Sequence, residues 1–201
     1  TLFIETEAGL NHLKVMKLSC RSWDDLREVY GLLVTAGVPF PYDTIVVDTV
    51  DRLVSYAQEE AISRAKVKFS KHADNIHAIG DIPEGVGWYW VTTMIDNMIS
   101  KLEQLPAATV LISHVATKEV KEPTRTVTKD TISIGGQVGT RLLHWADHTL
   151  HVRSRYNGSR LERTVRTLPS ETMEAGSRGR VIPDGTIWGE SDMENYQQLR
   201  K

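Results

Sequence analysis

The feature that most constrains the fold is a run of apolar, largely β-branched residues, Thr44-Ile-Val-Val47, which leads directly into Asp48. An uninterrupted run of this kind is typical of a strand that is buried on both faces of a parallel sheet. Parallel strands are joined by crossover connections, which are usually helices that cover the sheet. The run therefore predicts an α/β fold.

The rest of the N-terminal half follows the same alternation. Short apolar runs at Leu2–Ile4 and Thr109–Ser113 predict two more buried strands. Between the runs lie segments with helical periodicity, and Ser22 followed by Asp25 is typical of a helix start. Helices are predicted after Ser22, from about Asp51 to Lys71, and from Val91 to Leu105. We expect a mostly parallel sheet flanked by helices.

The C-terminal half has weaker patterns. Residues 117–136 are polar and without a period, which predicts a long loop. Leu142–Ala146 is expected to be helical. Thr149–Arg153 and Leu161–Thr167 are expected to form a C-terminal β-hairpin that turns near Asn157-Gly158. A short helix is expected over residues 191–201, and no internal repeat or second domain is evident.

Composition excludes several classes of protein. The 201 residues are 40% hydrophobic and 25% charged, as in globular domains, and the net charge of −2 excludes a histone-like polycation. A single cysteine, Cys20, has no partner for an internal disulfide. Neither a signal peptide nor a membrane span is evident, so the prediction is a protein of the cell interior with no membrane partner.

All three predicted strands end in polar residues. The first is followed by Glu5-Thr6-Glu7, the second by Asp48-Thr49 and the third by Ser113-His114. Open α/β sheets bind ligands at the carboxyl ends of their strands. An apolar strand that ends in Asp and Ser or Thr is a Walker B pattern, whose carboxylate accepts hydrogen bonds from water bound to Mg²⁺. The alternative is that Asp48 only caps the next helix.

Two further side chains, Glu7 and His114, are candidate site residues because they follow strands that neighbour the Asp48 strand. A carboxylate on a neighbouring strand end, such as Glu7, can orient and deprotonate a water molecule that attacks a γ-phosphate. His114 can sense that phosphate by hydrogen bonding. The alternatives are that Glu7 is an exposed loop acid and that His114 is a structural histidine.

These sites occur in an order that resembles the RecA and RadA family. Phe3-Ile-Glu-Thr-Glu7 resembles the Phe-Ile-Asp-Ala-Glu stretch of RecA, and Ile45-Val-Val-Asp48-Thr49 resembles its Walker B strand. Ser113-His-Val-Ala-Thr-Lys118 and the segment Leu142 to Leu150 are similar to stretches of RadA. The layout, including Gly87-Trp-Tyr89 and Glu174-Ala-Gly-Ser-Arg178, also resembles phage RecA-like ATPases of single-strand annealing.

The resemblance implies a single RecA-like P-loop NTPase domain over residues 1–201 that uses ATP and Mg²⁺. Glu7 would be the catalytic base and Asp48 with Thr49 would bind the nucleotide and, through water, the Mg²⁺. His114 would couple the γ-phosphate to the loop behind it. Arg178 would be an arginine finger that reaches a neighbour's nucleotide, although the lysine and phenylalanine that flank this arginine in RadA are missing here.

One departure from the family concerns the phosphate-binding loop. The chain contains no Gly-x-x-x-x-Gly-Lys-Ser/Thr. The family carries it one strand and one helix before the stretch that matches Phe3-Ile4, so we expect the first strand and the Walker A loop upstream of Thr1. Backbone amides and the lysine of that loop cradle the phosphates, so residues 1–201 alone are expected to bind ATP poorly and to be inactive.

The resemblance also suggests where DNA binds. RecA-like proteins grip single-stranded DNA with the loop that follows the position of His114, which here carries Lys118, Lys121, Arg125 and Lys129. A solvated loop is the alternative. Trp88, Tyr89 and Trp90 could stack on bases, but aromatic residues that open an amphipathic helix more often belong to a core or an interface. Two other basic clusters lie at 64–71 and 153–166.

The resulting prediction is a phage-type, ATP-dependent recombination protein that binds single-stranded DNA and supports annealing or strand exchange. We expect a homo-oligomer, as a ring or filament, with a single-strand-binding protein as a further partner, in the cytoplasm of a bacterial host. Two alternatives remain: a non-catalytic DNA-binding or assembly subunit, and a RecA-like helicase motor.

Overall fold

The computed structural model describes residues 1–121, 125–158, 160–178 and 183–188. The chain divides into two compact units, one of residues 1–114 with 134–138, the other of residues 115–133 with 139 onward. Each unit is described by itself. The helix expected over residues 191–201 lies outside the described residues.

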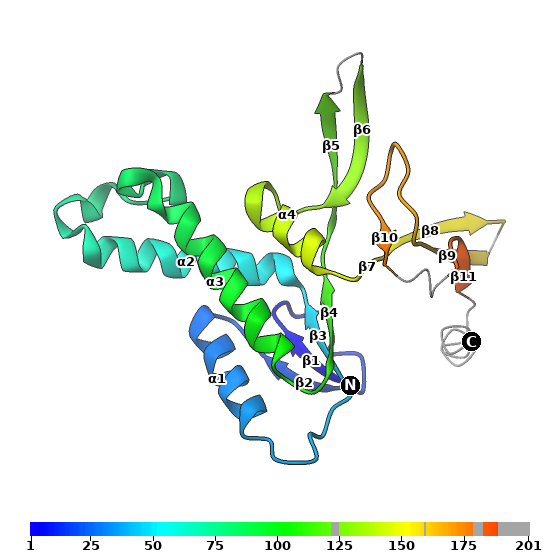
Figure 1. Ribbon diagram of the computed structural model, residues 1–201, viewed down its shortest axis with the longest axis horizontal. Coiled ribbons are helices and arrows are strands. Elements are labelled where there is room, and N and C mark those ends of the chain that lie inside the picture. Colours follow the sequence, from blue (N-terminus) through cyan, green and yellow to red (C-terminus); the bar gives the residue numbers. More distant parts are fainter. Residues whose placement is uncertain (122–124, 159, 179–182, 189–201) are drawn as a thin grey trace. The chain divides into compact units, whose positions relative to one another are not determined.

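The first unit contains a four-stranded parallel sheet, which includes the three strands that the apolar runs predicted and one strand that they did not, β2. Its strands are β1 (Leu2–Glu5), β2 (Met16–Ser19), β3 (Thr44–Asp48) and β4 (Ala108–Ile112), in the order β2-β1-β3-β4. Glu5 of β1 lies directly opposite Asp48 of β3, which in turn lies opposite Ile112 of β4. The carboxyl ends of the strands therefore meet along one edge (Figure 1).

Strand β4 differs from the prediction of a buried strand. It is the outer strand of the described sheet, and its residues alternate between exposed and half-buried. Val110 and Ile112 are 44% and 39% exposed. An apolar run looks the same in sequence at the centre and at the edge of a sheet, so the neighbours in space decided this burial.

Three helices lie on one side of this sheet (Figure 1): α1 (Trp23–Val34), α2 (Val50–Lys68) and α3 (Val86–Glu103). Ser22 caps α1, because its hydroxyl accepts the Asp25 N–H at 3.0 Å. The sheet face under the helices has an apolar centre, with Ile4, Ile45 and Val47 each 0% exposed. These helices confirm the three predicted from periodicity.

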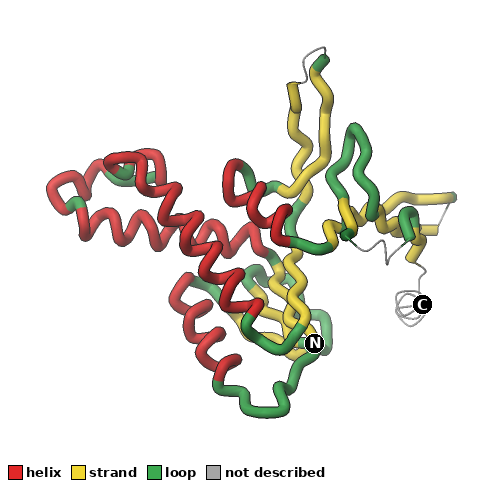
Figure 2. The backbone as a smooth tube through the Cα atoms, in the orientation of Figure 1, coloured by secondary structure: helices red, strands yellow, loops and turns green. Residues whose placement is uncertain are grey.

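Helices α2 and α3 are joined by three short 3-10 helices, η1 (Ser70–Asn75), η2 (Ile79–Asp81) and η3 (Pro83–Gly85) (Figure 2). At the start of α3, Trp88 and Tyr89 are 54% and 69% exposed, so within this unit they do not belong to the core. Among the helices that the structure describes, none has the length and apolar content needed to cross a membrane.

The second unit overturns the prediction of a long loop. Residues Val115–Lys121 and Thr126–Ile132 form strands β5 and β6, which pair as an antiparallel hairpin. Both strands are rich in Val and Thr, which favour strands, but neither carries an apolar face to signal them. Without that face, periodicity alone has no means of finding the hairpin.

Among the described residues, the remaining elements are one helix and five strands. They are α4 (Gly136–Trp145), β7 (His148–Thr149), β8 (His151–Asn157), β9 (Arg160–Arg166), β10 (Gly176–Ser177) and β11 (Thr186–Trp188). Strands β8 and β9 pair antiparallel, and β11 joins them in the order β11-β9-β8. Val165 and Met173, 0% and 2% exposed, are the most buried apolar residues of this unit's core.

Candidate functional site

Two threonines, Thr6 and Thr49, join the ends of β1 and β3 by hydrogen bonds. The Thr49 N–H donates to the Thr6 hydroxyl at 2.7 Å, and that hydroxyl donates to the Thr49 carbonyl at 2.8 Å. The Tyr56 hydroxyl of α2 donates to the Thr6 carbonyl at 3.1 Å. The peptide bond between Asp48 and Thr49 is cis. Because Thr6 and Thr49 are buried, the residues beside them have defined positions.

Glu7 and His114 come together at this edge. The Thr49 hydroxyl donates to Glu7 Oε1 at 3.0 Å, and His114 Nε2 lies 3.6 Å from Glu7 Oε2. The side chains of Glu7 and His114 are 44% and 62% exposed, so water reaches both. Glu7 is therefore not an isolated loop acid, because two polar side chains from other strand ends hold its carboxylate.

Asp48 carries a carboxylate beside Glu7 and does not cap the next helix. The N-cap of α2 is Thr49, whose hydroxyl accepts the Arg52 N–H. Burial raises the pKa of Asp48, and the negative charge of Glu7 raises it further. A cation at this edge would relieve the repulsion between the two carboxylates.

The donor set fits Mg²⁺ held through water. Mg²⁺ prefers oxygen ligands, keeps several of its waters, and takes few direct ligands from protein when a phosphate is bound. Asp48, Glu7 and Thr49 supply two carboxylates and a hydroxyl at one edge. In the part of the chain that the structure describes, no group of three His, Cys, Asp or Glu side chains is placed to hold a metal ion directly.

Two acids at this site were missed from the sequence. Asp51 of α2 accepts the Ser113 hydroxyl at 3.2 Å and the His114 N–H at 3.0 Å. Its position three residues after Asp48, in the first turn of a helix, was the only available signal.

Glu5 is the second missed acid, and it is almost fully buried, at 1% exposed. It accepts hydrogen bonds from Lys17 at 3.0 Å, Ser19 at 3.2 Å and Arg21 at 3.2 Å. The Lys17 ammonium lowers the pKa of Glu5 to about 2 despite the opposing effect of burial. Glu5 is thus ionised at neutral pH and bonded within β1, β2 and the following loop.

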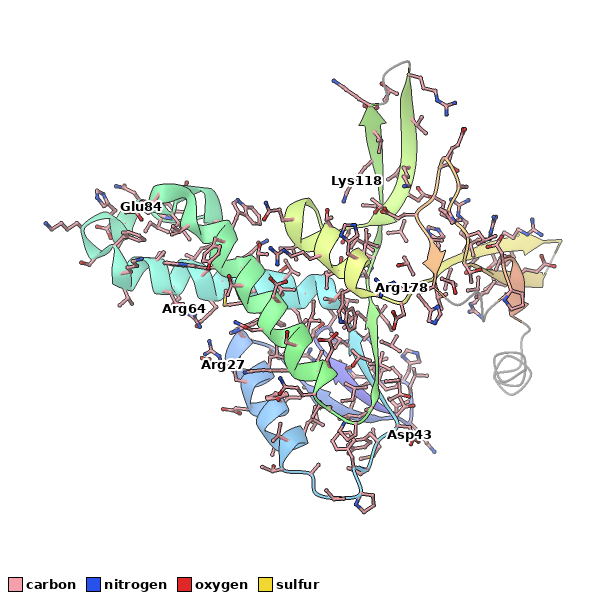
Figure 3. The ribbon with its side chains drawn as sticks, viewed as in Figure 1. Arg27, Asp43, Arg64, Glu84, Lys118 and Arg178 are labelled. Atoms are coloured by element: carbon pink, nitrogen blue, oxygen red, sulfur yellow. The ribbon has the colours of Figure 1, made fainter. Side chains whose placement is uncertain are left out.

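Arg178 belongs to the second unit, where it directly follows β10 (Figure 3). Its guanidinium donates to Asp147 Oδ1 at 2.8 Å and to the His144 carbonyl at 2.5 Å. These groups line a cavity of about 450 Å³ next to the end of α4. The predicted arginine finger is therefore paired within its own chain.

The four cations of the predicted DNA-binding loop lie on or beside the β5–β6 hairpin, where Figure 3 labels Lys118. Lys118 lies directly opposite Lys129. Lys118 donates to the Ile132 carbonyl at 3.0 Å, and Lys129 lies 3.8 Å from Glu174. Lys121 ends β5, and Arg125, just before β6, pairs with Glu171 at 3.0 Å.

Three of the arginines along β8 and β9 have acidic partners in the described structure. Arg153 pairs with Asp130, Arg155 with Glu162 at 3.3 Å, and Arg166 with Asp184 at 3.0 Å. Each pair lies within the second unit, so these arginines present less net positive charge than their number in the sequence suggests.

Comparison with known proteins agrees with the geometry of the first unit. A family model described as an AAA domain matches residues 1–179, and a comparison with curated proteins gave no match. A parallel sheet flanked by helices fits the α/β P-loop fold of such domains, which bind nucleotides, usually with Mg²⁺. The chain belongs to the AAA domain family of P-loop ATPases.

Proposed function

We propose that this chain is the core of a RecA-like ATPase that binds single-stranded DNA and promotes annealing or strand exchange. The observation that carries the proposal is the convergence of Glu7, Asp48 and His114 at one edge of a parallel sheet in an AAA domain. Two acids with distinct environments beside a histidine suit the activation of water next to a bound phosphate.

The three residues have separate roles in this proposal. Glu7 takes the proton of the attacking water, because its carboxylate is exposed to solvent and oriented by Thr49. Asp48 accepts hydrogen bonds from the water shell of Mg²⁺. His114 couples the bound γ-phosphate to the hairpin, because its ring faces Glu7 and the next residue begins β5. ATP with Mg²⁺ supplies the phosphoryl group that is transferred to water.

The β5–β6 hairpin supports the DNA part of the proposal. Like charges directly opposite each other on paired strands are destabilising, and Lys118 and Lys129 form such a pair. Glu174 lies 3.8 Å from Lys129, and a nucleic-acid phosphate near that face would bring a further negative charge to the pair. Val120 and Val127 form another directly opposed pair on the same face, because they lie two residues from the lysines.

Assembly and further partners complete the proposal. Arg178 acts on a neighbouring subunit's nucleotide only after it leaves Asp147 and the His144 carbonyl. A homo-oligomer, as a ring or filament, brings a second subunit close enough for this contact. A single-strand-binding protein is the further partner expected at DNA under recombination.

The experiment that tests the proposal is ATP hydrolysis by the full-length protein, with and without single-stranded DNA. We expect turnover that DNA stimulates. Glu7→Gln should lower kcat by about 100- to 10,000-fold, the usual contribution of a general base, while ATP binding persists. Glu28→Gln, an exposed acid on α1, is the matched control and should leave kcat unchanged. Normal hydrolysis by Glu7→Gln would remove Glu7 from the mechanism.

A non-catalytic DNA-binding or assembly subunit is the second candidate. A Gly-x-x-x-x-Gly-Lys-Ser/Thr loop in the full-length protein would favour the ATPase over this candidate. A folded, DNA-binding, full-length protein without turnover would establish this alternative. A helicase motor would instead separate a forked duplex in the presence of ATP, whereas an annealing protein would join complementary strands.

A further inference from the structure

Asp51 bridges two elements that are distant in sequence. It is the second residue of α2, in the first turn of the helix that follows Asp48. Its Oδ1 accepts the Ser113 hydroxyl at 3.2 Å, and its Oδ2 accepts the main-chain N–H of His114 at 3.0 Å. Both carboxylate oxygens therefore hold the residues that directly follow β4.

Favourable interaction with the helix dipole does not account for this arrangement. An acid in the first turn stabilises any helix, and Asp24 occupies the same second position in α1. Asp24 is 71% exposed and pairs with Arg27 of its own helix. Asp51 instead bonds residues 62 and 63 positions further along the chain.

The bond to the His114 N–H holds the backbone from which the histidine ring extends toward Glu7. With its backbone held by Asp51, His114 places Nε2 3.6 Å from Glu7 Oε2. The Ser113 hydroxyl lies 3.2 Å from both Asp51 Oδ1 and the His114 carbonyl, and its single proton is available to either acceptor. The next residue, Val115, begins β5.

We propose that Asp51 is a positioning residue that holds His114 against Glu7 and makes ATP hydrolysis responsive to the occupancy of the β5–β6 hairpin. This role rests on the proposed function, in which Glu7 activates water and the hairpin binds DNA. Asp51 acts through its hydrogen bonds to Ser113 and His114, where the chain continues from the end of β4 into the hairpin.

Three variants of the full-length protein test the proposal. Asp51→Ala removes both acceptors, Asp51→Asn keeps one carbonyl oxygen for the His114 N–H, and Asp24→Ala removes an acid from the equivalent position of α1. For each we would measure kcat and KM for ATP, with and without an oligo(dT) strand. Hydrogen exchange at residues 113–116 would report on the backbone itself.

For Asp51→Ala we expect kcat to fall by about 10- to 100-fold, the loss typical of misplaced catalytic groups, with KM for ATP changed less than about threefold. Stimulation by DNA should fall toward none, and exchange at His114 should accelerate. Asp51→Asn should recover part of kcat and part of the stimulation by DNA. Asp24→Ala should leave kinetics and exchange at the site as in the wild type.

The outcomes separate the two proposals. If Asp51→Ala leaves exchange at His114 unchanged, Asp51 does not hold this backbone. If exchange accelerates while kcat and DNA stimulation stay at wild-type values, Asp51 holds the backbone without positioning a reacting group. A wild-type protein without ATPase activity overturns the proposed function and the catalytic role of Asp51 together, whereas an active wild type with unchanged Asp51→Ala kinetics overturns the role of Asp51 alone.

Discussion

At the scale of single residues, the pKa values of Glu5 and Asp48 shift in different directions, although the two acids are register partners on β1 and β3. Lys17 lowers the pKa of Glu5 to about 2, whereas burial and the charge of Glu7 raise the pKa of Asp48. The ionised form of Glu5 is therefore stabilised by the fold, and the ionised form of Asp48 is destabilised by it. Such a destabilised carboxylate has the most to gain from a bound cation.

The first prediction concerns the effect of ionised Asp48 on the free energy of unfolding. Because its folded-state pKa is raised, ionised Asp48 lowers the free energy of unfolding at every pH above its unfolded pKa. Asp48→Asn should therefore raise the melting temperature at pH 7 without nucleotide, by about 2–4 °C for each kcal/mol regained in a chain of this size. Thermal unfolding followed by circular dichroism checks this, and ATPase activity should be lost.

A matched comparison at low pH tests the cause. At a pH where Asp48 is protonated, the wild type and Asp48→Asn should melt at the same temperature. An Asp48→Asn variant that melts below the wild type at pH 7 would contradict the prediction.

The second prediction concerns Glu5, whose folded-state pKa is lowered from 4.5 to about 2. An acid with a lowered pKa contributes stability that is present above its unfolded pKa and is lost as pH falls through the folded one. Wild-type stability should therefore decline between about pH 4.5 and 2, and Glu5→Gln should be less stable at pH 7 with a shallower decline. Urea unfolding across this pH range measures the free energy of unfolding of both proteins. Glu28→Gln should retain the wild-type slope, and a wild-type slope in Glu5→Gln would refute the assignment.

At the scale of elements, the β5–β6 hairpin gives the cations of the predicted loop a defined geometry. Strand pairing places Lys118 and Lys129 on one face, whereas Lys121 lies on the other face because it is three residues from Lys118. Not all four predicted cations can therefore contact one strand of DNA on the same face.

The corresponding prediction is for the double variant Lys118→Gln with Lys129→Gln. Its affinity for oligo(dT) should fall, and the slope of log affinity against log salt should decrease by about 1.4, because each phosphate contact on a single strand contributes about 0.7. Fluorescence anisotropy over a salt series measures both. Lys14→Gln, an exposed lysine of the first unit, is the control. An unchanged slope in the double variant would place DNA elsewhere.

At the scale of the whole molecule, the family match runs through both compact units, from residue 1 to residue 179. The first unit holds Glu7, Asp48 and His114, and the second holds Arg178 and the hairpin lysines. The only covalent links between the units are the chain crossings after residues 114, 133 and 138. His114 occupies the first of these crossings, which is why its backbone contacts carry the inference about Asp51.

The sequence by itself determined the parallel sheet, the three helices that cover it and the strand ends that carry polar residues. These features depend on local patterns: the apolar run before Asp48, the helical period of α3 and the cap at Ser22. The Walker B pattern is local as well, whereas the order of the motifs came from the resemblance to the RecA and RadA family, and the roles of their residues stay predictions.

Only the tertiary structure decided the rest. The exposed position of β4, the pairing of β5 with β6, and the partners of Glu5, Asp51 and Arg178 all depend on residues far apart in the chain. A carboxylate's neighbours in space determine its pKa and its hydrogen bonds, and a local pattern contains no information about them. For this reason the sequence identified Glu7 and Asp48, while the bonds that hold His114 beside Glu7 became evident only from the fold.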